Sequence, residues 1–270
     1  MGELPDLVRR APGPLRSLAG AVSTWTHPGR LALVRRRLAE LYGTGVAPAP
    51  DAGDAGEAPE EWRSTAFVVV APPDRWRIVE RGHVEACDGQ STWAGTSTLV
   101  TEGRADRASL RDTGVVGICL YPGQVLTEFE VGEPDPGEAD GRPCFVVDAR
   151  PRVPERRGPG GRGAPVDLAL SGGRRLAHFV GVDHRFWFDA ETGVVLRHQG
   201  SVDGQRCSTI VLTDLVFDRP LGSVEFGPPP GAVIRSSHEL LRDHLQEMGI
   251  DPDLVDLDDS EAVRRALRGR

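Results

Sequence analysis

The sequence predicts an α+β protein built around a large antiparallel sheet, and two observations support that prediction. Between residues 61 and 235, short segments rich in Val, Thr, Phe and Trp are separated by tight turns such as Asp88-Gly89 and Asp203-Gly204. Connections this short force neighbouring strands to run antiparallel. Gly and Pro supply 33 and 22 of the 270 residues, which favours many turns over long helices.

The predicted strands follow one another along the middle of the chain. In Arg75–Glu80, Trp76 and Ile78 alternate with arginines, so one face of this strand is apolar and the other is charged. Cys207–Phe217 is apolar on both faces, with Ile210, Leu212 and Val216 expected to share one of them. The full set is Ser64–Val70, Arg75–Glu80, His83–Cys87, Ser91–Trp93, Thr96–Thr101, Cys144–Ala149, His184–Asp189, Val194–Gln199 and Cys207–Phe217.

Composition divides the chain into three segments, residues 1–60, 61–235 and 236–270. The first is Arg-rich and helical and ends in a linker, residues 44–60, made mostly of Ala, Gly, Pro and acidic residues. Its clearest helix starts after Pro28 and stops at Gly43, with apolar residues spaced three and four apart between them. In the last segment, Ser236 and Glu239 fit a capping box that opens a helix ending at Gly249, and a second helix starts near Ser260.

Two stretches interrupt the predicted strands. Gly132–Pro143 is acidic and Pro-rich, and Pro151–Pro165 is basic and Gly-rich, so both are expected to be long loops. The second contains Gly158–Gly163, which matches G-x-G-x-x-G. A dinucleotide site needs a strand before this motif and a helix after it. Neither is predicted there, and we interpret the glycines as part of the loop.

Charge and hydropathy exclude several classes of protein. The 32 basic residues, all of them Arg, are outnumbered by 40 acidic ones, so the net charge is -8 and nucleic acid is not expected as a partner. The longest apolar run, Ala66–Ala71, is far shorter than the roughly 20 residues of a membrane-spanning helix. We see no secretory signal and no lipid-attachment cysteine near the start, and the 4 Cys form no C-x-x-C pair. These features predict a cytoplasmic protein with reduced, mostly buried thiols.

The search for catalytic or metal-binding residues finds no such site. The 7 His are scattered, and although His184 and His198 lie in adjacent predicted strands and could face each other, we expect them to be partly exposed strand residues rather than metal ligands. No nucleophile motif and no spaced pair of general acid and base is present. The sequence therefore predicts a non-enzyme with no metal and no cofactor.

The order of motifs resembles the LolA/RseB family of periplasmic lipoprotein carriers and stress sensors. The matching segments, which together span residues 61–235, are Pro73–Val79, Cys87–Trp93, Gly141–Pro151, Phe186–Arg197, Leu212–Phe217 and Phe226–Gly231. The resemblance implies a strongly curved antiparallel half-barrel with helices packed on its concave side. It also implies that an acyl chain or another apolar group is held between sheet and helices without covalent chemistry.

We therefore expect a non-catalytic carrier or sensor that binds a lipid-like or acyl ligand in a half-barrel cavity. The alternative is a cytoplasmic adaptor or regulatory module that uses the same fold to bind a protein partner. A filled interior would count against the carrier, and an open apolar groove would favour it. The residues expected to line the cavity are Phe67, Trp76, Ile78, Trp93, Phe145, Val147, Phe186, Phe188, Leu196, Ile210 and Leu212.

Overall fold

A computed structural model describes residues 3–11, 15–42, 61–71, 74–105, 110, 113–152, 179–222, 226–257 and 259–268. The chain forms two compact units. The large unit comprises Met1–Pro73 and Ser109–Leu221, and the small unit comprises Asp74–Ala108 and Gly222–Arg270. The predicted linker 44–60 and the glycine motif 158–163 lie outside the described residues, as does nearly all of the predicted loop 151–165.

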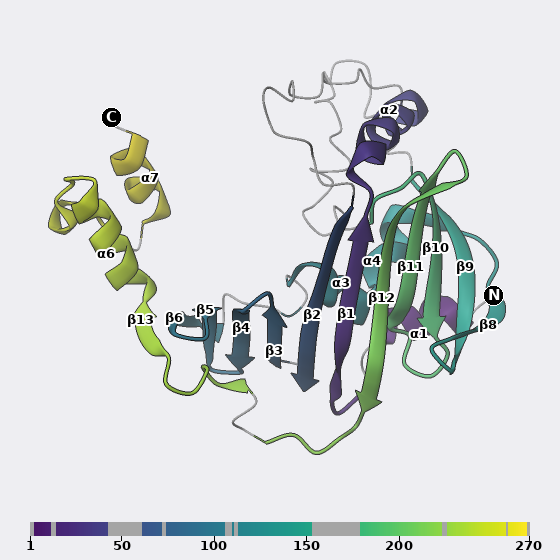
Figure 1. Cartoon of the computed structure of the whole chain (residues 1–270), viewed down its shortest axis with the longest axis horizontal. Coiled ribbons are helices and arrows are strands. Elements are labelled where there is room, and N and C mark those ends of the chain that lie inside the picture. Colours follow the sequence, from purple (N-terminus) through teal and green to yellow (C-terminus); the bar gives the residue numbers. More distant parts are fainter. Residues whose placement is uncertain are drawn as a thin grey trace. The chain divides into compact units, whose positions relative to one another are not determined.

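The large unit is an open, curved and antiparallel half-barrel sheet, as the sequence predicts (Figure 1). In spatial order its strands are β2 (Trp62–Ala71), β1 (Leu18–Thr26), β12 (Gln205–Phe217), β11 (Val195–Val202), β10 (Asp183–Asp189), β9 (Arg142–Pro151) and β7 (Phe129–Val131). A further strand, β8 (Asp135–Ala139), also pairs with β9.

Helices cover one face of this sheet, which we call the inner face. They are α1 (Glu3–Arg10), α3 (Gly114–Leu120) and α4 (Gly123–Glu128), and Figure 1 shows α3 and α4 behind the strands. Helix α3 contacts β11, and α4 contacts β7 and α1. Five residues of α3, Val116 to Leu120, are buried, so this helix is held by packing rather than by its own length. A separate helix, α2 (Leu31–Tyr42), follows the short 3-10 turn η1 (Pro28–Arg30) and contacts β11.

The small unit contains an antiparallel run of four strands, β3 (Arg75–Glu80), β4 (His83–Asp88), β5 (Ser91–Thr96) and β6 (Leu99–Arg104). Strand β13 (Val233–Ser236) pairs with β6 in parallel. The chain then forms α6 (Ser237–Glu247), the 3-10 turn η5 (Pro252–Leu254) and α7 (Ser260–Arg268). The predicted capping box is confirmed: the Ser236 side chain accepts from Glu239 N, and the Glu239 side chain accepts from Ser236 N.

Two-residue turns set the antiparallel order, as the sequence predicts for Asp203-Gly204. Both residues of this turn have positive φ, 49° and 74°, the conformation of a type I′ hairpin turn. The pair Asp140-Gly141, which joins β8 to β9, has φ of 51° and 73°. Glycine at the second position adopts this conformation without strain.

Three sequence predictions differ from the structure. Residues 18–26, predicted to belong to a helical segment, form β1, which pairs with β2 on one side and β12 on the other. Residues 132–143, predicted to be a loop, include β8, whose Pro136 and acidic residues suit an edge strand. Helices α3 and α4 were not predicted, because both are short and contain Gly and β-branched residues.

Candidate functional site

The inner face of the large unit is apolar across most of its width. Residues opposite one another in a sheet point to the same face. One such row runs from Val147 in β9 through Phe186 in β10 and His198 in β11 to Ile210 in β12. All four are at most 2% exposed.

Most of the predicted cavity residues lie on this face. Phe188 is opposite Phe145, while Leu196 and Leu212 are two residues from His198 and Ile210 on their strands. Phe145 is half-buried, and the others are buried. The members that the structure brings together are Phe145, Val147, Phe186, Phe188, Leu196, Ile210 and Leu212.

The other predicted residues do not join this set. Phe67 lies on the opposite face of β2 and is 64% exposed, because it alternates with the buried Ala66 and Val68. Val216 likewise leaves the face of Leu212, since the register between β1 and β12 shifts before it. A bulge of this kind moves every later side chain to the other face.

Trp76, Ile78 and Trp93 belong to the small unit. Trp76 is opposite Cys87 in β4, whereas Trp93 is opposite the adjacent residue Ala86, so the two tryptophans lie on opposite faces of that sheet. Both are buried. Trp93 packs with Ala86, Val100 and Ala232, which makes it part of a core rather than of a shared cavity wall with Trp76.

An aromatic cluster surrounds two histidines at the inner face. Phe129 of β7 meets the rings of His184 and Phe186 at centroid distances of 4.8 and 5.5 Å. Phe179, just before β10, meets Phe186 at 5.1 Å and His198 at 4.6 Å. Sequence reasoning missed both Phe129 and Phe179, because neither lies in a segment that alternates. We call these five residues the His-Phe cluster.

The two histidines face each other, as their places in adjacent strands allow, but they are buried rather than partly exposed. His184 is 3% exposed and His198 is 0% exposed. His184 Nδ1 lies 3.0 Å from His198 Nε2, a hydrogen bond. Burial lowers the pKa of His184 to about 3 and outweighs a hydrogen-bonding contact with the Gly181 backbone, which raises it. Burial, followed by the charge of His184, lowers the pKa of His198 well below its ordinary value, so both rings are neutral at pH 7.

The outer nitrogens of the pair lack partners. Neither His184 Nε2 nor His198 Nδ1 forms a hydrogen bond of normal geometry with a described residue. Buried polar atoms nearly always have a partner, because leaving them without one costs about 1–3 kcal/mol. The His-Phe cluster is therefore apolar except for two unsatisfied ring nitrogens.

A short segment, Phe179–Val182, holds one side of the cluster, and we call it the strap. The Val180 carbonyl accepts hydrogen bonds from Ser208 Oγ and Cys207 Sγ, and Val182 N donates to Ser201 O at 2.8 Å. The strap passes directly over Gly200 in β11. A Cβ on Gly200 would lie 1.8 Å from the Val180 oxygen, so only glycine permits this approach.

Asp189 is a second buried polar site in the large unit, and it is fully paired. Its Oδ2 accepts from Arg142 Nε at 2.6 Å, and its Oδ1 accepts from Thr192 N and Thr192 Oγ1, both at 2.8 Å. Burial alone would raise the pKa of Asp189, but the hydrogen bonds from Arg142 and Thr192 outweigh it and lower this pKa. Asp189, Thr192 and Gly193 are the D-x-x-T-G motif of the sequence, which here closes the turn between β10 and β11.

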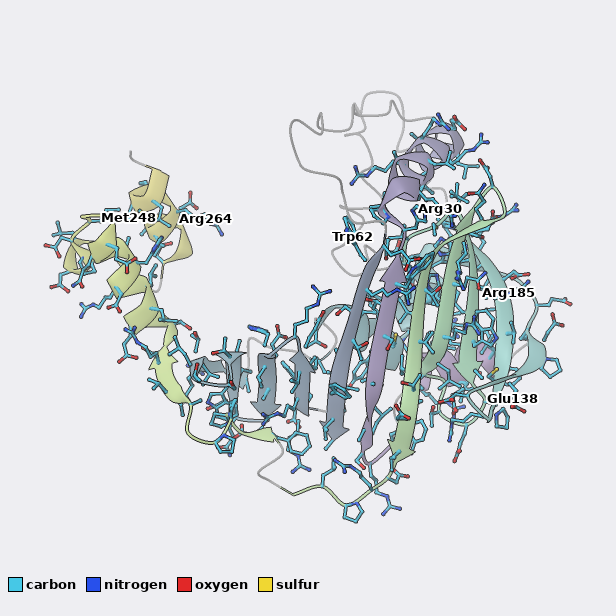
Figure 2. All side chains as sticks on the ribbon, in the orientation of Figure 1. Arg30, Trp62, Glu138, Arg185, Met248 and Arg264 are labelled. Carbon is cyan, nitrogen blue, oxygen red and sulfur yellow. The ribbon has the colours of Figure 1, made fainter. Side chains whose placement is uncertain are left out.

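A groove of about 640 Å³ lies over β7, β9, β10 and β11, and its lining includes His184 and several charged residues. Four of these charged residues form two ion pairs. Arg185, labelled in Figure 2, donates from Nε to Asp148 Oδ1 at 2.6 Å, and Arg150 Nε donates to Asp183 at 2.9 Å. Because Asp183 and Arg185 flank the inward-facing His184 on β10, these side chains are on the opposite face of the sheet from the His-Phe cluster.

Other chemistry is not assembled in the described part of the chain. Cys87, Cys119, Cys144 and Cys207 are free and buried, and burial raises the pKa of Cys119 to about 12, which keeps it an unreactive thiol. Within the described ranges, no group of three or more His, Cys, Asp or Glu could hold a metal ion. Of the helices that the structure describes, none is long and apolar enough to cross a membrane.

Comparisons with known proteins find similar structures but no matching sequences. No family model matches the chain, and neither does any curated protein. The crystal structure of MucB is 12% identical with a TM-score of 0.46, over 86% of this chain and 64% of MucB, so the chain spans less than two thirds of that protein. The LolA superfamily protein NE2245 from Nitrosomonas europaea is 11% identical with a TM-score of 0.32, over 83% of this chain and 96% of that one.

The lipoprotein LppX from Mycobacterium tuberculosis is also similar, at 12% identity and a TM-score of 0.39, over 82% of this chain and 97% of LppX. The chain's own sheet is open, curved and antiparallel, with α3 and α4 covering the inner face, which is the fold that the resemblance to the LolA/RseB family implies.

Proposed function

We propose that the protein binds an apolar ligand, such as an acyl chain, between the inner face of the large unit and helices α3 and α4, without catalysing a reaction on it. The observation that carries the proposal is the inner face itself, where aromatic and aliphatic side chains from β9 to β12 form an apolar surface that includes one histidine, His198, under a helical cover.

The driving force is hydrophobic. Each methylene transferred from water contributes about 0.8 kcal/mol, so roughly ten methylenes supply about 8 kcal/mol before the costs of association. A ligand of this kind needs few specific contacts, which agrees with the His-Phe cluster, where two ring nitrogens lack a well-formed partner among the described residues.

The inner-face side chains from Val147 to Ile210 are at most 2% exposed, which counts against a preformed open groove. A ligand must therefore displace part of the cover. Helix α3 has 7 residues and α4 has 6, and neither has a side-chain hydrogen bond at its N-terminus. Helices this short are marginal by themselves and depend on packing. Binding would exchange their contacts with the sheet for contacts with the ligand.

Binding to delipidated protein tests this proposal. We expect saturable binding of lauric acid by isothermal titration calorimetry and a bound acyl compound in organic extracts of the purified protein. Val116→Trp, in the buried face of α3, should weaken binding at least tenfold by filling the interior, whereas Phe67→Ala, on the exposed face of β2, should not. Absence of saturable binding to the folded protein would remove the proposal, as would an equal effect of both substitutions.

A protein partner is the second candidate, because β13 is an edge strand with exposed apolar residues. Val233 is 60% exposed, Ile234 is 47% exposed, and the neighbouring Leu99 is 41% exposed. Edge strands can pair with a strand of another chain. Val233→Lys with Ile234→Lys should then abolish capture of a specific partner from the native cell while leaving lauric acid binding intact. Capture that is unaffected by this double substitution would count against the second candidate.

A further inference from the structure

We propose that His184 and His198 form a polar seat for the hydrogen-bonding end of the apolar ligand, and that Phe179 is a plug that leaves this seat when the ligand enters. The inference rests on the proposed function and adds to it the chemistry of the ligand's polar end, which is a hydroxyl or a protonated carboxyl group.

The hydrogen-bonding capacity of the seat follows from the pairing of the two rings. A neutral imidazole has one N–H donor and one bare nitrogen that accepts. The bond between His184 Nδ1 and His198 Nε2 uses one donor and one acceptor, whichever ring donates. The remaining atoms, His184 Nε2 and His198 Nδ1, are therefore always one donor and one acceptor, and neither has a well-formed partner among the described residues.

This pattern matches a group that both donates and accepts. A hydroxyl or a protonated carboxyl does both, an ether only accepts, and a hydrocarbon does neither. The aromatic residues around the seat, Phe129, Phe179 and Phe186, carry no charge that could stabilise an ion. Burial, the main cause of the lowered pKa of His184, also keeps the rings neutral, so the seat favours an uncharged end over a phosphate or an ammonium group.

Phe179 is the member of the cluster best placed to leave. The other four belong to β7, β10 and β11, whose backbones are paired within the sheet. Phe179 lies on the strap, which is attached at Val180 by the Ser208 and Cys207 side chains. Its ring contacts His198 at 4.6 Å, so its departure would uncover the pair directly.

Three probes of equal chain length test the seat on the delipidated full-length protein. Dodecan-1-ol donates and accepts, 1-methoxydodecane only accepts, and lauric acid supplies the carboxyl group. We expect the alcohol to bind about tenfold more tightly than the ether, the effect of one well-formed hydrogen bond. His184→Phe with His198→Phe should bring this ratio to about one while preserving binding of the ether.

The outcomes separate the seat from the function on which it rests. If the wild-type protein binds none of the probes, the proposed function is wrong. If it binds the alcohol and the ether equally well, the function stands and the seat is wrong. Should the double variant fail to fold, His198→Gln is the second variant, because an amide both donates and accepts, and it should keep the preference for the alcohol. Loss of the preference in a folded His198→Gln protein would overturn the assignment of His198 as a hydrogen-bonding partner of the ligand's polar end.

The pH dependence of lauric acid binding tests whether the seat takes a protonated carboxyl group or a carboxylate. Its affinity should rise as the pH falls from 8 to 6, because the seat takes the protonated form, while the affinity for dodecan-1-ol should stay constant. A lauric acid affinity that is highest at pH 8 would show that the seat takes a carboxylate and would overturn the selection for neutral ends.

Two substitutions test the plug. Phe179→Ala removes the ring, and Gly200→Ala removes the space under the strap without changing the ring. Both should raise the affinity for the alcohol and the ether alike, whereas the control Phe67→Ala should change neither. Unchanged or weaker binding by the folded Phe179→Ala protein would overturn the plug.

Discussion

The large unit buries two polar sites that are built in opposite ways. Asp189 is 1% exposed in its side chain, and both of its carboxylate oxygens are occupied by donors from Arg142, Thr192 and the turn backbone. His184 and His198 are as deeply buried, but each keeps one ring nitrogen without a well-formed partner. A buried site whose hydrogen bonds are all made stabilises one structure. A buried site with an unpaired donor and acceptor can still form hydrogen bonds with a ligand. This difference separates the structural site from the candidate ligand seat.

The largest expected effect comes from removing the paired carboxylate. Asp189→Ala leaves Arg142 without its partner and the turn donors unsatisfied, so we expect the free energy of unfolding to fall by about 3–5 kcal/mol. Asp148→Ala is the matched control, because Asp148 receives Arg185 Nε at the same 2.6 Å but is 71% exposed in its side chain. It should cost at most about 1 kcal/mol. Urea denaturation measures both, and similar losses would contradict the contrast.

As the pH falls, the loss of stability that comes from the histidines should begin at a higher pH than the loss that comes from Asp189. The pKa of His184 falls from 6.5 to about 3 on folding. Between these two pH values the unfolded chain therefore binds a proton at His184 that the folded chain does not bind. The free energy of unfolding has its full value above pH 6.5 and falls with the pH. The loss due to His184 alone is about 2 kcal/mol at pH 5. The pKa of Asp189 is lowered from 3.8, so its stabilisation is lost only below about pH 4.

Unfolding curves at pH 7 and pH 5 check this order. The wild-type protein should lose stability between the two values, and His184→Phe with His198→Phe should remove most of that loss. A double variant that is as acid-sensitive as the wild type would place the sensitivity elsewhere.

Replacing the glycine by alanine should reduce stability more in the turn next to Asp189 than in a hairpin turn of similar conformation. Gly193 and Gly141 have φ of 75° and 73°, so alanine is strained at both. A Cβ on Gly193 would also lie 2.7 Å from the Leu7 carbonyl oxygen, whereas one on Gly141 meets nothing within 4 Å. We expect losses of about 2–3 kcal/mol for Gly193→Ala and about 1 kcal/mol for Gly141→Ala. Thermal or urea unfolding would measure the difference, and equal losses would mean that the turn adjusts.

The smallest effect concerns one of the donors to Asp189. Thr192→Val removes the hydroxyl that donates to Asp189 Oδ1 but keeps the backbone donor and the volume of the side chain. We expect a loss of about 1 kcal/mol, because the carboxylate retains its other partners. A loss as large as that of Asp189→Ala would indicate that the hydroxyl, rather than Arg142, dominates the site.

Alternation and turn chemistry explain how much of the fold was predictable. Strand β3 has the predicted bounds because Trp76 and Ile78 alternate with Arg75 and Arg77. Strand β1 was missed because its sequence, LAGAVSTWT, consists largely of small residues without alternation. A Cβ on its Gly20 would lie 2.9 Å from the Thr213 carbonyl oxygen, a constraint on residue size that comes from a distant strand.

The candidate site was predictable only in part for the same reason. Phe186 and Phe188 alternate with exposed or half-buried residues, so their face could be deduced. Phe67 stands in the run AFVVVA, which is apolar at every position, and the parity of such a strand cannot be derived from its sequence. His184 and His198 pack against Phe129 and Phe179, which lie outside the alternating segments of β10 and β11.

Photocrosslinking tests most directly whether the interior of the large unit holds an apolar ligand. A fatty acid with a diazirine at mid-chain would be added to the delipidated protein, with and without excess lauric acid, and labelled peptides identified by mass spectrometry. We predict competable labelling in residues 114–128 and in β9 to β12. Labelling confined to peptides around the exposed Phe67, or labelling that lauric acid does not compete, would contradict the account.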